Sequence, residues 1–286
     1  MIATFQDGGL GRVSASSGVS AGALDSFTTN LWAAYGITRQ RSSTAYSGSA
    51  IRVRKSTGGD TTTEQDIGFN GAALDTGSLA AFAGSETVVV TKFYDQSGSG
   101  RDLVQATGAS QPRIVNAGVY DGFVRFDGSN DWLQTSATSG AGTVFSVSTK
   151  SSYRSATPLQ VTYVKGVQAQ AYINGTSSQI VIYTDSSTGG DALNLFSPSF
   201  STTKVYGYIH NAAGGTGALC SRVFDNGTEL ATTVGGGVNT GTFSAAVWAL
   251  GASVGGGAYC AQDVYSFAIW EAQQSANMAG IAAAMA

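Results

Sequence analysis

The spacing of short β-like runs constrains the fold of this chain more than any other feature. Runs rich in Val, Ile, Thr and aromatic residues alternate with clusters of Gly, Asn and Ser at intervals of roughly 8–12 residues. The run Thr87–Phe93 is mostly β-branched and predicts a central buried strand. The pairs 174–175 and 226–227 are both Asn-Gly, which suits the positive φ angles of a type I′ hairpin turn. We therefore predict an all-β fold, an antiparallel β-sandwich of the jelly-roll type, in which two sheets pack face to face.

Short helices are expected beside the strands. Residues 24–35 carry apolar side chains at three- and four-residue spacing, which predicts a helix of one or two turns near the N-terminus. Asp75–Gly84 has the length and apolar content of a second short helix. At the C-terminus, residues 278–285 place Met, Ile and Ala on one stripe, with Ser275 as the expected cap.

The N-terminal segment differs from the rest of the chain in composition. Residues 1–22 are rich in Gly, Ser and Ala with scattered apolar residues, a composition typical of a linker or an extended arm. We predict an arm or assembly segment over residues 1–30 and one jelly-roll domain over residues 31–286. The arm is expected to lie along a partner protein.

Composition excludes several classes of function. Charged residues make up 12% of the chain and the net charge is −3, and no basic run is longer than Arg52–Lys55, so nucleic-acid binding is not expected. No stretch reaches the roughly 18 apolar residues of a membrane span, and residues 1–30 show no signal peptide. Synthesis and retention in a cytosol follow as the simplest expectation. Cys220 and Cys260 are compatible with two free thiols or with one disulfide, and no metal-ligand spacing is present.

The densest motif lies between Phe93 and Phe126. A polar turn follows the β-branched run, and a second strand ends at Phe126 before another turn, DGSNDW. Asp and Ser side chains can bond nearby backbone groups, and Gly can take positive φ angles, so turn chemistry accounts for the first turn without any ligand. The predicted structural turn residues are Asp95, Gln96, Ser97, Gly98 and Asp102.

These motifs resemble a known family. The stretch 94–105, YDQSGSGRDLVQ, matches the pattern YDQSGxGxxLxQ, and the blocks 50–54, 111–115 and 126–133 accompany it along the chain. With these blocks the chain resembles concanavalin A-like (laminin-G/glucanase) jelly rolls, in particular the catalytic domain of the α-L-arabinofuranosidase B family and a related domain of bacteriophage structural proteins. The resemblance extends over roughly residues 31–286 and implies a carbohydrate-related fold.

The resemblance also implies where catalytic acids would lie. A retaining glycosidase needs two carboxylates, one as nucleophile and one as acid/base. The family's acid/base position corresponds to residues 250–257, LGASVGGG, which contain no acid; the nearest acid is Asp263. The nucleophile position falls near residues 180–185 and offers Asp185 but no Glu. The family's adjacent cysteine pair is also missing. We therefore expect no catalytic residues; in an enzyme with relocated acids, Asp185 and Asp263 would be the candidates.

Carbohydrate sites combine aromatic faces with oxygen and nitrogen groups. The candidates for such a site are Asp127, Asp131, Trp132 and Tyr183. The turn after Phe126 is also faintly Ca²⁺-like, but an Asx-stabilised turn explains it better, so no metal or other cofactor is expected. His210, the single histidine, is expected to be a structural, hydrogen-bonded residue.

The resemblance and the missing acids together favour a bacteriophage virion protein with a lectin-like domain, as a capsid decoration, fibre, spike or tail component. Its arm would bind other virion proteins, the chain would form a homo-oligomer on the particle surface, and the sandwich would contact host glycans. Neither a membrane nor a nucleic acid is an expected partner. The alternatives are a glycoside hydrolase of the α-L-arabinofuranosidase type and a stand-alone carbohydrate-binding module.

Overall fold

The computed structural model describes residues 19–56, 61–154, 160–166, 169–174, 179–184, 192–198, 200–216, 221–231, 233–236, 238–239 and 241–286. Its strands and helices, in chain order, are β1 (Leu31–Gly36), β2 (Ile51–Lys55), β3 (Glu64–Ile67), β4 (Phe69–Asn70), β5 (Ala73–Leu74), α1 (Thr76–Ala83), β6 (Val88–Phe93), β7 (Leu103–Val104), β8 (Arg113–Asn116), β9 (Val119–Asp127), β10 (Leu133–Thr135), β11 (Val144–Tyr153), β12 (Gln160–Lys165), β13 (Ala169–Asn174), β14 (Gln179–Thr184), β15 (Ala192–Phe196), β16 (Lys204–Asn211), β17 (Gly215–Thr216), β18 (Ser221–Asp225), β19 (Thr228–Glu229), β20 (Thr233–Gly236), β21 (Val238–Asn239), β22 (Trp248–Leu250), β23 (Ala261–Trp270) and α3 (Met278–Met285).

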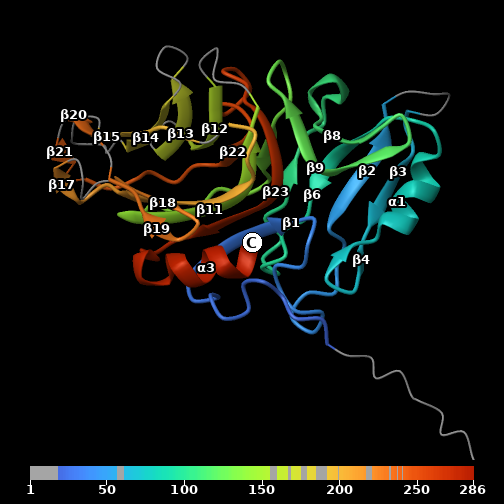
Figure 1. The fold of residues 1–286 in the computed structure, drawn as a ribbon, viewed down its shortest axis with the longest axis horizontal. Coiled ribbons are helices and arrows are strands. Elements are labelled where there is room, and N and C mark those ends of the chain that lie inside the picture. Colours follow the sequence, from blue (N-terminus) through green and yellow to red (C-terminus); the bar gives the residue numbers. More distant parts are fainter. Residues whose placement is uncertain are drawn as a thin grey trace, which may run out of the picture.

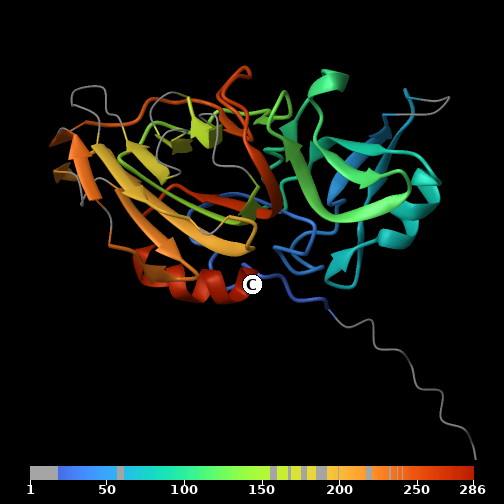
Figure 2. The ribbon, with the colours of Figure 1, turned by 45° about the horizontal axis from the view of Figure 1, so that its top comes forward.

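Strand β23 is the hub of the sheet network. It pairs antiparallel with β1, with β9 and with β11. Beyond β11 the order continues through β16, β18 and β19, and beyond β9 it continues through β8, β6, β2 and β3. Figures 1 and 2 show β23, in red, between the strands of the N-terminal half and those of the C-terminal half.

A second series of strands forms the opposite layer. Its order is β7, β10, β22, β12, β13, β14, β15 and β20, and it joins the first series where β6 pairs with β7. All these pairings are antiparallel. The predicted all-β sandwich is therefore confirmed.

Aromatic side chains from both layers fill the space between them. The ring of Tyr163 on β12 lies 5.3 Å from that of Tyr208 on β16 and 5.9 Å from that of Phe267 on β23, measured between centroids. Phe145 on β11 meets Trp248 on β22 edge to face at 5.7 Å. Such pairs contribute about 0.5–1.5 kcal/mol each beyond the burial of their area. The core therefore fixes the two layers against each other.

The predicted helices are formed in two places out of three. Helix α1 occupies the expected segment after Asp75, whose carboxylate accepts the N–H of Ser78 as an N-cap. Helix α3 forms at the C-terminus, but its N-cap is Asn277 and makes no side-chain capping bond, because Ser275 begins a preceding 3₁₀ turn. The hairpin turn at Asn226 and Gly227 has φ angles of 47° and 83°, as a type I′ turn requires.

The helix expected over residues 24–35 is not formed. Residues 23–26 make turns and β1 begins at Leu31. Strand β1 is buried on both faces: Ala34 packs in the cluster under α3, whereas Tyr35 packs in the main core. An apolar run buried on both faces has no period-2 signal, so its spacing imitates that of a helix.

The described part of the expected arm, residues 19–30, packs on the domain. Leu24 is fully buried beside α3, and its N–H donates to the carbonyl of Gln40. The indole of Trp270 on β23 donates to the carbonyl of Phe27 at 2.8 Å. These contacts attach the segment to the same face as α3. None of the described helices is long and apolar enough to cross a membrane.

Candidate functional site

The turn after β6 is held by its own side chains. The carboxylate of Asp95 accepts the N–H groups of Ala34, Ser97 and Arg101 at 2.9–3.1 Å. Its own N–H donates to the carboxylate of Asp102 at 3.0 Å. These bonds use the polar groups of the turn to join it to β1. Gln96 extends the connection, because its amide bonds the backbone of Gly36 and of Gln40, while Gly98 adopts a φ of 87°.

The turn after β9 brings two carboxyl groups together. One carboxylate oxygen of Asp127 accepts the N–H groups of Ser129, Asn130 and Asp131 at 2.7–3.3 Å. The carboxyl of Asp131 accepts the N–H of Asp127 in return, at 2.9 Å. Asp131 is 7% exposed, whereas Asp127 is exposed to solvent. The two acids are therefore neighbours in different environments.

The loop after β22 lies against this turn. A Cβ placed on Gly256 would come within 2.8 Å of the hydroxyl of Tyr259 and 3.4 Å of the indole nitrogen of Trp132. A Cβ on Gly128 would meet Ala261 at 2.8 Å. Trp132 and Tyr259 are both half-buried. Trp132 and Tyr259 thus lie where the loop after β22 approaches the turn after β9. This loop includes the segment 250–257, where the family resemblance places the acid/base.

An ion-pair cluster lies under the same turn. The carboxylate of Asp263 on β23 accepts the guanidinium of Arg125 at 3.1 Å and that of Arg154 at 3.0 Å. Arg154 also donates to the carbonyl of Phe126, the residue before the turn. Burial raises the pKa of Asp263, and the two guanidiniums oppose that effect. Because Arg125 and Arg154 both donate to its carboxylate, Asp263 acts as a buried ion-pair partner.

Asp131 has the most informative charge environment of the cluster. Burial and the nearby charge of Asp127 raise the pKa of its carboxyl to about 7, against the opposing effects of the Asp127 N–H and of Arg113 and Arg154. A carboxyl group that titrates near neutral pH can hold a proton and give it up under physiological conditions.

Sequence reasoning identified Asp127, Asp131 and Trp132 and placed them in one turn, which the structure brings next to the loop 251–257. It missed Arg154 and Tyr259, for which no local pattern exists. The expected site residue Asp185, the side chain of Tyr183 and Cys220 lie outside the described part of the chain. Cys260 is fully buried, and burial raises the pKa of its thiol.

His210 lies in the core. Its two ring nitrogens lie 2.8 Å from the hydroxyl of Tyr163 and 2.9 Å from that of Thr184. The imidazole is completely buried. Within the described residues, no cluster of three or more His, Cys, Asp or Glu side chains is arranged to hold a metal ion.

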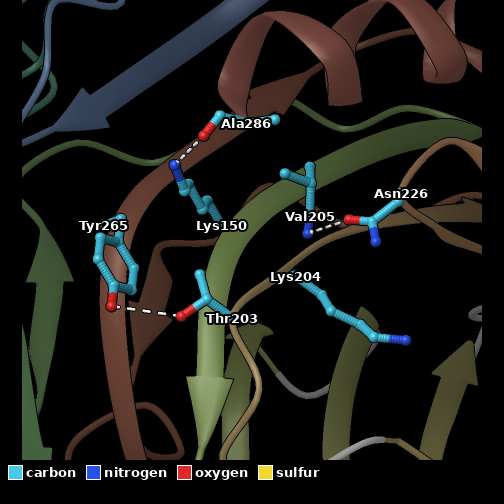
Figure 3. Close-up of a pocket in the computed structure, with 7 residues that line it drawn as sticks. All are labelled: Lys150, Thr203, Lys204, Val205, Asn226, Tyr265 and Ala286. Atoms are coloured by element: carbon cyan, nitrogen blue, oxygen red, sulfur yellow. Dashed lines mark hydrogen bonds between the residues drawn. The ribbon is translucent and has the colours of Figure 1, made fainter.

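A separate hollow of about 380 Å³ lies beside the end of α3 (Figure 3), lined by Lys150, Thr203, Lys204, Val205, Asn226, Tyr265 and Ala286. Lys150 donates to the carbonyl of Ala286, and Lys204 forms an ion pair with Asp225. Figure 3 shows the ammonium of Lys204 directed away from Lys150 and Tyr265. The charge of Lys204 is thus paired, and the ammonium of Lys150 is held by a backbone oxygen.

Comparison with known sequences gives local matches to two enzymes. The chain is 36% identical over 100 residues to a probable α-L-arabinofuranosidase B of Aspergillus flavus, a stretch that covers 34% of this chain and 19% of that protein. It is 37% identical over 91 residues to α-L-arabinofuranosidase B of Emericella nidulans, covering 31% and 18% respectively. The chain thus matches less than a fifth of the length of these curated relatives. No protein-family profile matches it.

Comparison with solved structures also gives arabinofuranosidases. An arabinofuranosidase complexed with arabinofuranosyl-α-1,2-xylobiose superposes with a TM-score of 0.61 and 16% identity, over 92% of this chain and 64% of that one. A second structure, a mutant GH54 α-L-arabinofuranosidase soaked with 4-nitrophenyl α-L-arabinofuranoside, gives a TM-score of 0.61 and 15% identity over the same shares of the two chains. At this identity the likeness shows the shared fold, and it extends over less than two thirds of those chains.

These relatives overturn the virion interpretation. The sequence matches and the fold matches both lead to arabinofuranosidases, the relatives of the alternative hypothesis, and give no support to a bacteriophage structural role. The motif 94–105 does not support the virion interpretation, because the relatives that the comparisons found are enzymes. What it does identify is the sandwich.

Proposed function

We propose that this chain is a glycoside hydrolase of the α-L-arabinofuranosidase type, which acts on glycans that carry α-L-arabinofuranosyl groups. The proposal rests on similarity to arabinofuranosidases. About a third of the chain matches them in sequence, and 92% of the chain matches one of them in fold. The raised pKa of Asp131, which precedes Trp132 in the sequence, supports it chemically.

Asp131 is the proposed proton donor. Cleavage of a glycosidic bond needs a proton on the leaving oxygen as the bond to the sugar carbon breaks. With a pKa of about 7, the Asp131 carboxyl is protonated in about half of the molecules at pH 7. Trp132 would support the face of a sugar ring, and Asp185, which follows β14 in the sequence, would be the second carboxylate.

The experiment compares two substrates whose leaving groups differ. Sugar hydroxyls leave poorly without a proton, whereas 4-nitrophenolate leaves readily. We expect Asp131→Asn to slow release of arabinose from arabinofuranosyl-α-1,2-xylobiose by about 10²–10⁴-fold, with a much smaller effect on 4-nitrophenyl α-L-arabinofuranoside. Asp185→Asn should abolish both reactions. Asp66→Asn, at an exposed ion pair with Arg52, is the matched control and should change neither.

The proposal fails if the folded protein releases arabinose from neither substrate. An equal loss on both substrates in Asp131→Asn would contradict the role of Asp131 as proton donor while leaving hydrolysis itself intact.

A second candidate is glycan binding without hydrolysis. It is favoured by the loop 251–257, which has no carboxyl group, and by the small exposure of Asp131. In that case arabinofuranosyl-α-1,2-xylobiose would bind without turnover, and Trp132→Ala would weaken its binding. Isothermal titration with the intact trisaccharide, followed by analysis of the recovered sugar, distinguishes the two functions.

A further inference from the structure

A second groove lies on the outer face of the N-terminal strands. It has a volume of about 370 Å³ and is lined by Arg52, Arg54, Glu64, Thr91, Lys92, Val104, Gln105, Ala106 and Gln111. The side chains come from β2, β3, β6 and β7 and from the loop that follows β7. On β2, Ile51 and Val53 face the core, so Arg52 and Arg54 share the outer face, as the alternation in the sequence indicates.

A β-bulge interrupts the pairing of β2 with β6 at this groove. In the pairing of β2 with β6, Arg52 opposes Lys92 and Val53 opposes Val90, so that Thr91 is the extra residue. Bulges redirect side chains and are common beside binding sites. The N–H of Gln105 donates to the carbonyl of Thr91 at 3.0 Å and fixes the bulge against the next loop.

The cations of the groove differ in their partners. Arg52 binds the carboxylate of Asp66 with two bonds of 2.7 and 3.0 Å, and Lys92 lies 3.3 Å from Asp102. Arg54, in contrast, donates only to neutral oxygens among the described residues. These are the side-chain oxygen of Gln111 and the carbonyls of Lys55 and Thr61. Glu64 lies opposite Arg54 in the pairing of β2 with β3, but its carboxylate pairs with Arg52 at 3.8 Å. Among the described residues, Arg54 therefore has no carboxylate within ion-pair distance.

The guanidinium of Arg54 is held in place by a rigid support. Gln111 is 5% exposed, and its amide nitrogen donates to the carbonyl of Gln105 at 2.7 Å, which turns its oxygen toward Arg54. A Cβ on Gly108 would lie 2.4 Å from one terminal nitrogen of Arg54, so the guanidinium packs closely against the backbone of Gly108. A fixed, half-buried guanidinium without a carboxylate partner is suited to bind an anion.

The same loop joins the groove to the candidate site. The amide of Gln105 donates to the carbonyl of Trp132 at 3.3 Å, and the N–H of Trp132 donates to the carbonyl of Ser110 at 3.1 Å. The support of Arg54 and the backbone of Trp132 are thus parts of one hydrogen-bonded unit.

We propose that the groove binds an acidic sugar, a hexuronic acid residue whose carboxylate pairs with Arg54. The exposed carboxylate of Glu64 supplies an acceptor for ring hydroxyls. As a subsite for the glycan that is hydrolysed, the groove rests on the proposed function. As a binding site it does not, because binding of a free uronate needs no turnover.

The test is titration calorimetry of the full chain at pH 7 and low salt with D-glucuronate, and with D-glucose and inorganic phosphate for comparison. D-Glucuronate should bind about 10- to 100-fold more tightly than D-glucose, as expected for hydrogen bonds to a charged group. Arg54→Met should remove this preference. The matched control is Arg39→Met, whose guanidinium likewise donates to backbone carbonyls, those of Gly71 and Tyr46, but lies outside the groove.

A second variant keeps the proposal testable if Arg54→Met does not fold. Glu64 is exposed and, among the described residues, is the one acid that lines the groove. Glu64→Gln should therefore strengthen glucuronate binding by about 2- to 5-fold, since it removes a like charge.

Equal binding of glucuronate and glucose would overturn the proposal, as would an unchanged affinity in Arg54→Met or an equal loss in Arg39→Met. Phosphate that binds as tightly as glucuronate would overturn the sugar specificity. If glucuronate binds as expected but no arabinofuranoside is cleaved, the proposed binding site is supported and the proposed hydrolase function is contradicted.

Discussion

Replacement of Asp131 by Asn tests the charge environment of the candidate site directly. The carboxyl is nearly inaccessible and its pKa is raised to about 7 from an ordinary value of 3.8. Because the folded pKa exceeds the unfolded one, ionisation of Asp131 opposes folding. The contribution of this group to stability is complete below about pH 3.8 and is lost as the pH rises through 7.

The size of the effect follows from the two pKa values. A difference of 7 − 3.8, about 3 pKa units, corresponds to about 4 kcal/mol at about 1.36 kcal/mol per unit, as an upper bound. Asn carries no charge, and its carbonyl oxygen can still accept the N–H of Asp127. We therefore expect Asp131→Asn to match the wild type in stability near pH 4 and to exceed it by up to this amount at pH 8.

Urea unfolding followed by tryptophan fluorescence, at several pH values between 4 and 8, measures the difference between the two proteins. Asp66→Asn is an opposite-sign control, because the hydrogen bond from Arg52 holds the pKa of Asp66 below its ordinary value. Its variant should lose stability relative to the wild type as the pH rises from 3 to 6. A gain in Asp131→Asn that is the same at pH 4 and pH 8 would refute the reasoning.

Three further predictions concern other buried groups. Lys165 is completely buried, and burial lowers the pKa of its ammonium to about 8 from 10.5, so wild-type stability should rise with pH between 8 and 10.5. In urea titrations Lys165→Met should be more stable than the wild type by up to about 3 kcal/mol at pH 7, and this difference should shrink between pH 8 and 10.5. A difference that does not depend on pH would contradict the prediction. Asp95→Asn should cost about 2–4 kcal/mol, measured by thermal unfolding, because an amide nitrogen would face N–H donors; an unchanged midpoint would show that the turn does not depend on the carboxylate. Gly256→Ala should lower the stability by about 1 kcal/mol, since the φ angle of 90° disfavours any Cβ. It should also shift the NMR signals of the Tyr259 and Trp132 side chains. Gly255→Ala, where a Cβ meets no neighbour, should leave those signals in place.

The sequence predicts best those features that depend on neighbours along the chain. The sandwich, α1, α3 and the hairpin at Asn226 follow from local periodicity and turn residues. The turn around Asp95 can be anticipated for the same reason, because the carboxylate bonds a residue two positions ahead. Strand β1 could not be recognised, since it is covered by α3 on one face and by the core on the other.

The candidate site depends instead on distant pairings. Arg125 and Asp263 are 138 positions apart and meet only because β9 pairs with β23. The sequence shows that residues 250–257 lack an acid, but not that Trp132 and Tyr259 border that loop. The burial that raises the pKa of Asp131 likewise depends on separate strands, whereas the charge of Asp127, which also raises it, lies in the same turn.

The position of β23 at the hub of the sheets sets the order in which a nascent chain can fold. Leu31 pairs with Trp270, and Ala261 pairs with Asp127, so β1, β9 and β11 all await a strand that is synthesised well after them. Until then β1 lacks its strand partner, and β9 and β11 are each paired on one edge, with β8 and β16. Open strand edges favour aggregation and slow folding. In a ribosome-stalled chain that stops before Ala261, residues 31–36 should therefore be protease-sensitive, because β1 pairs with β23.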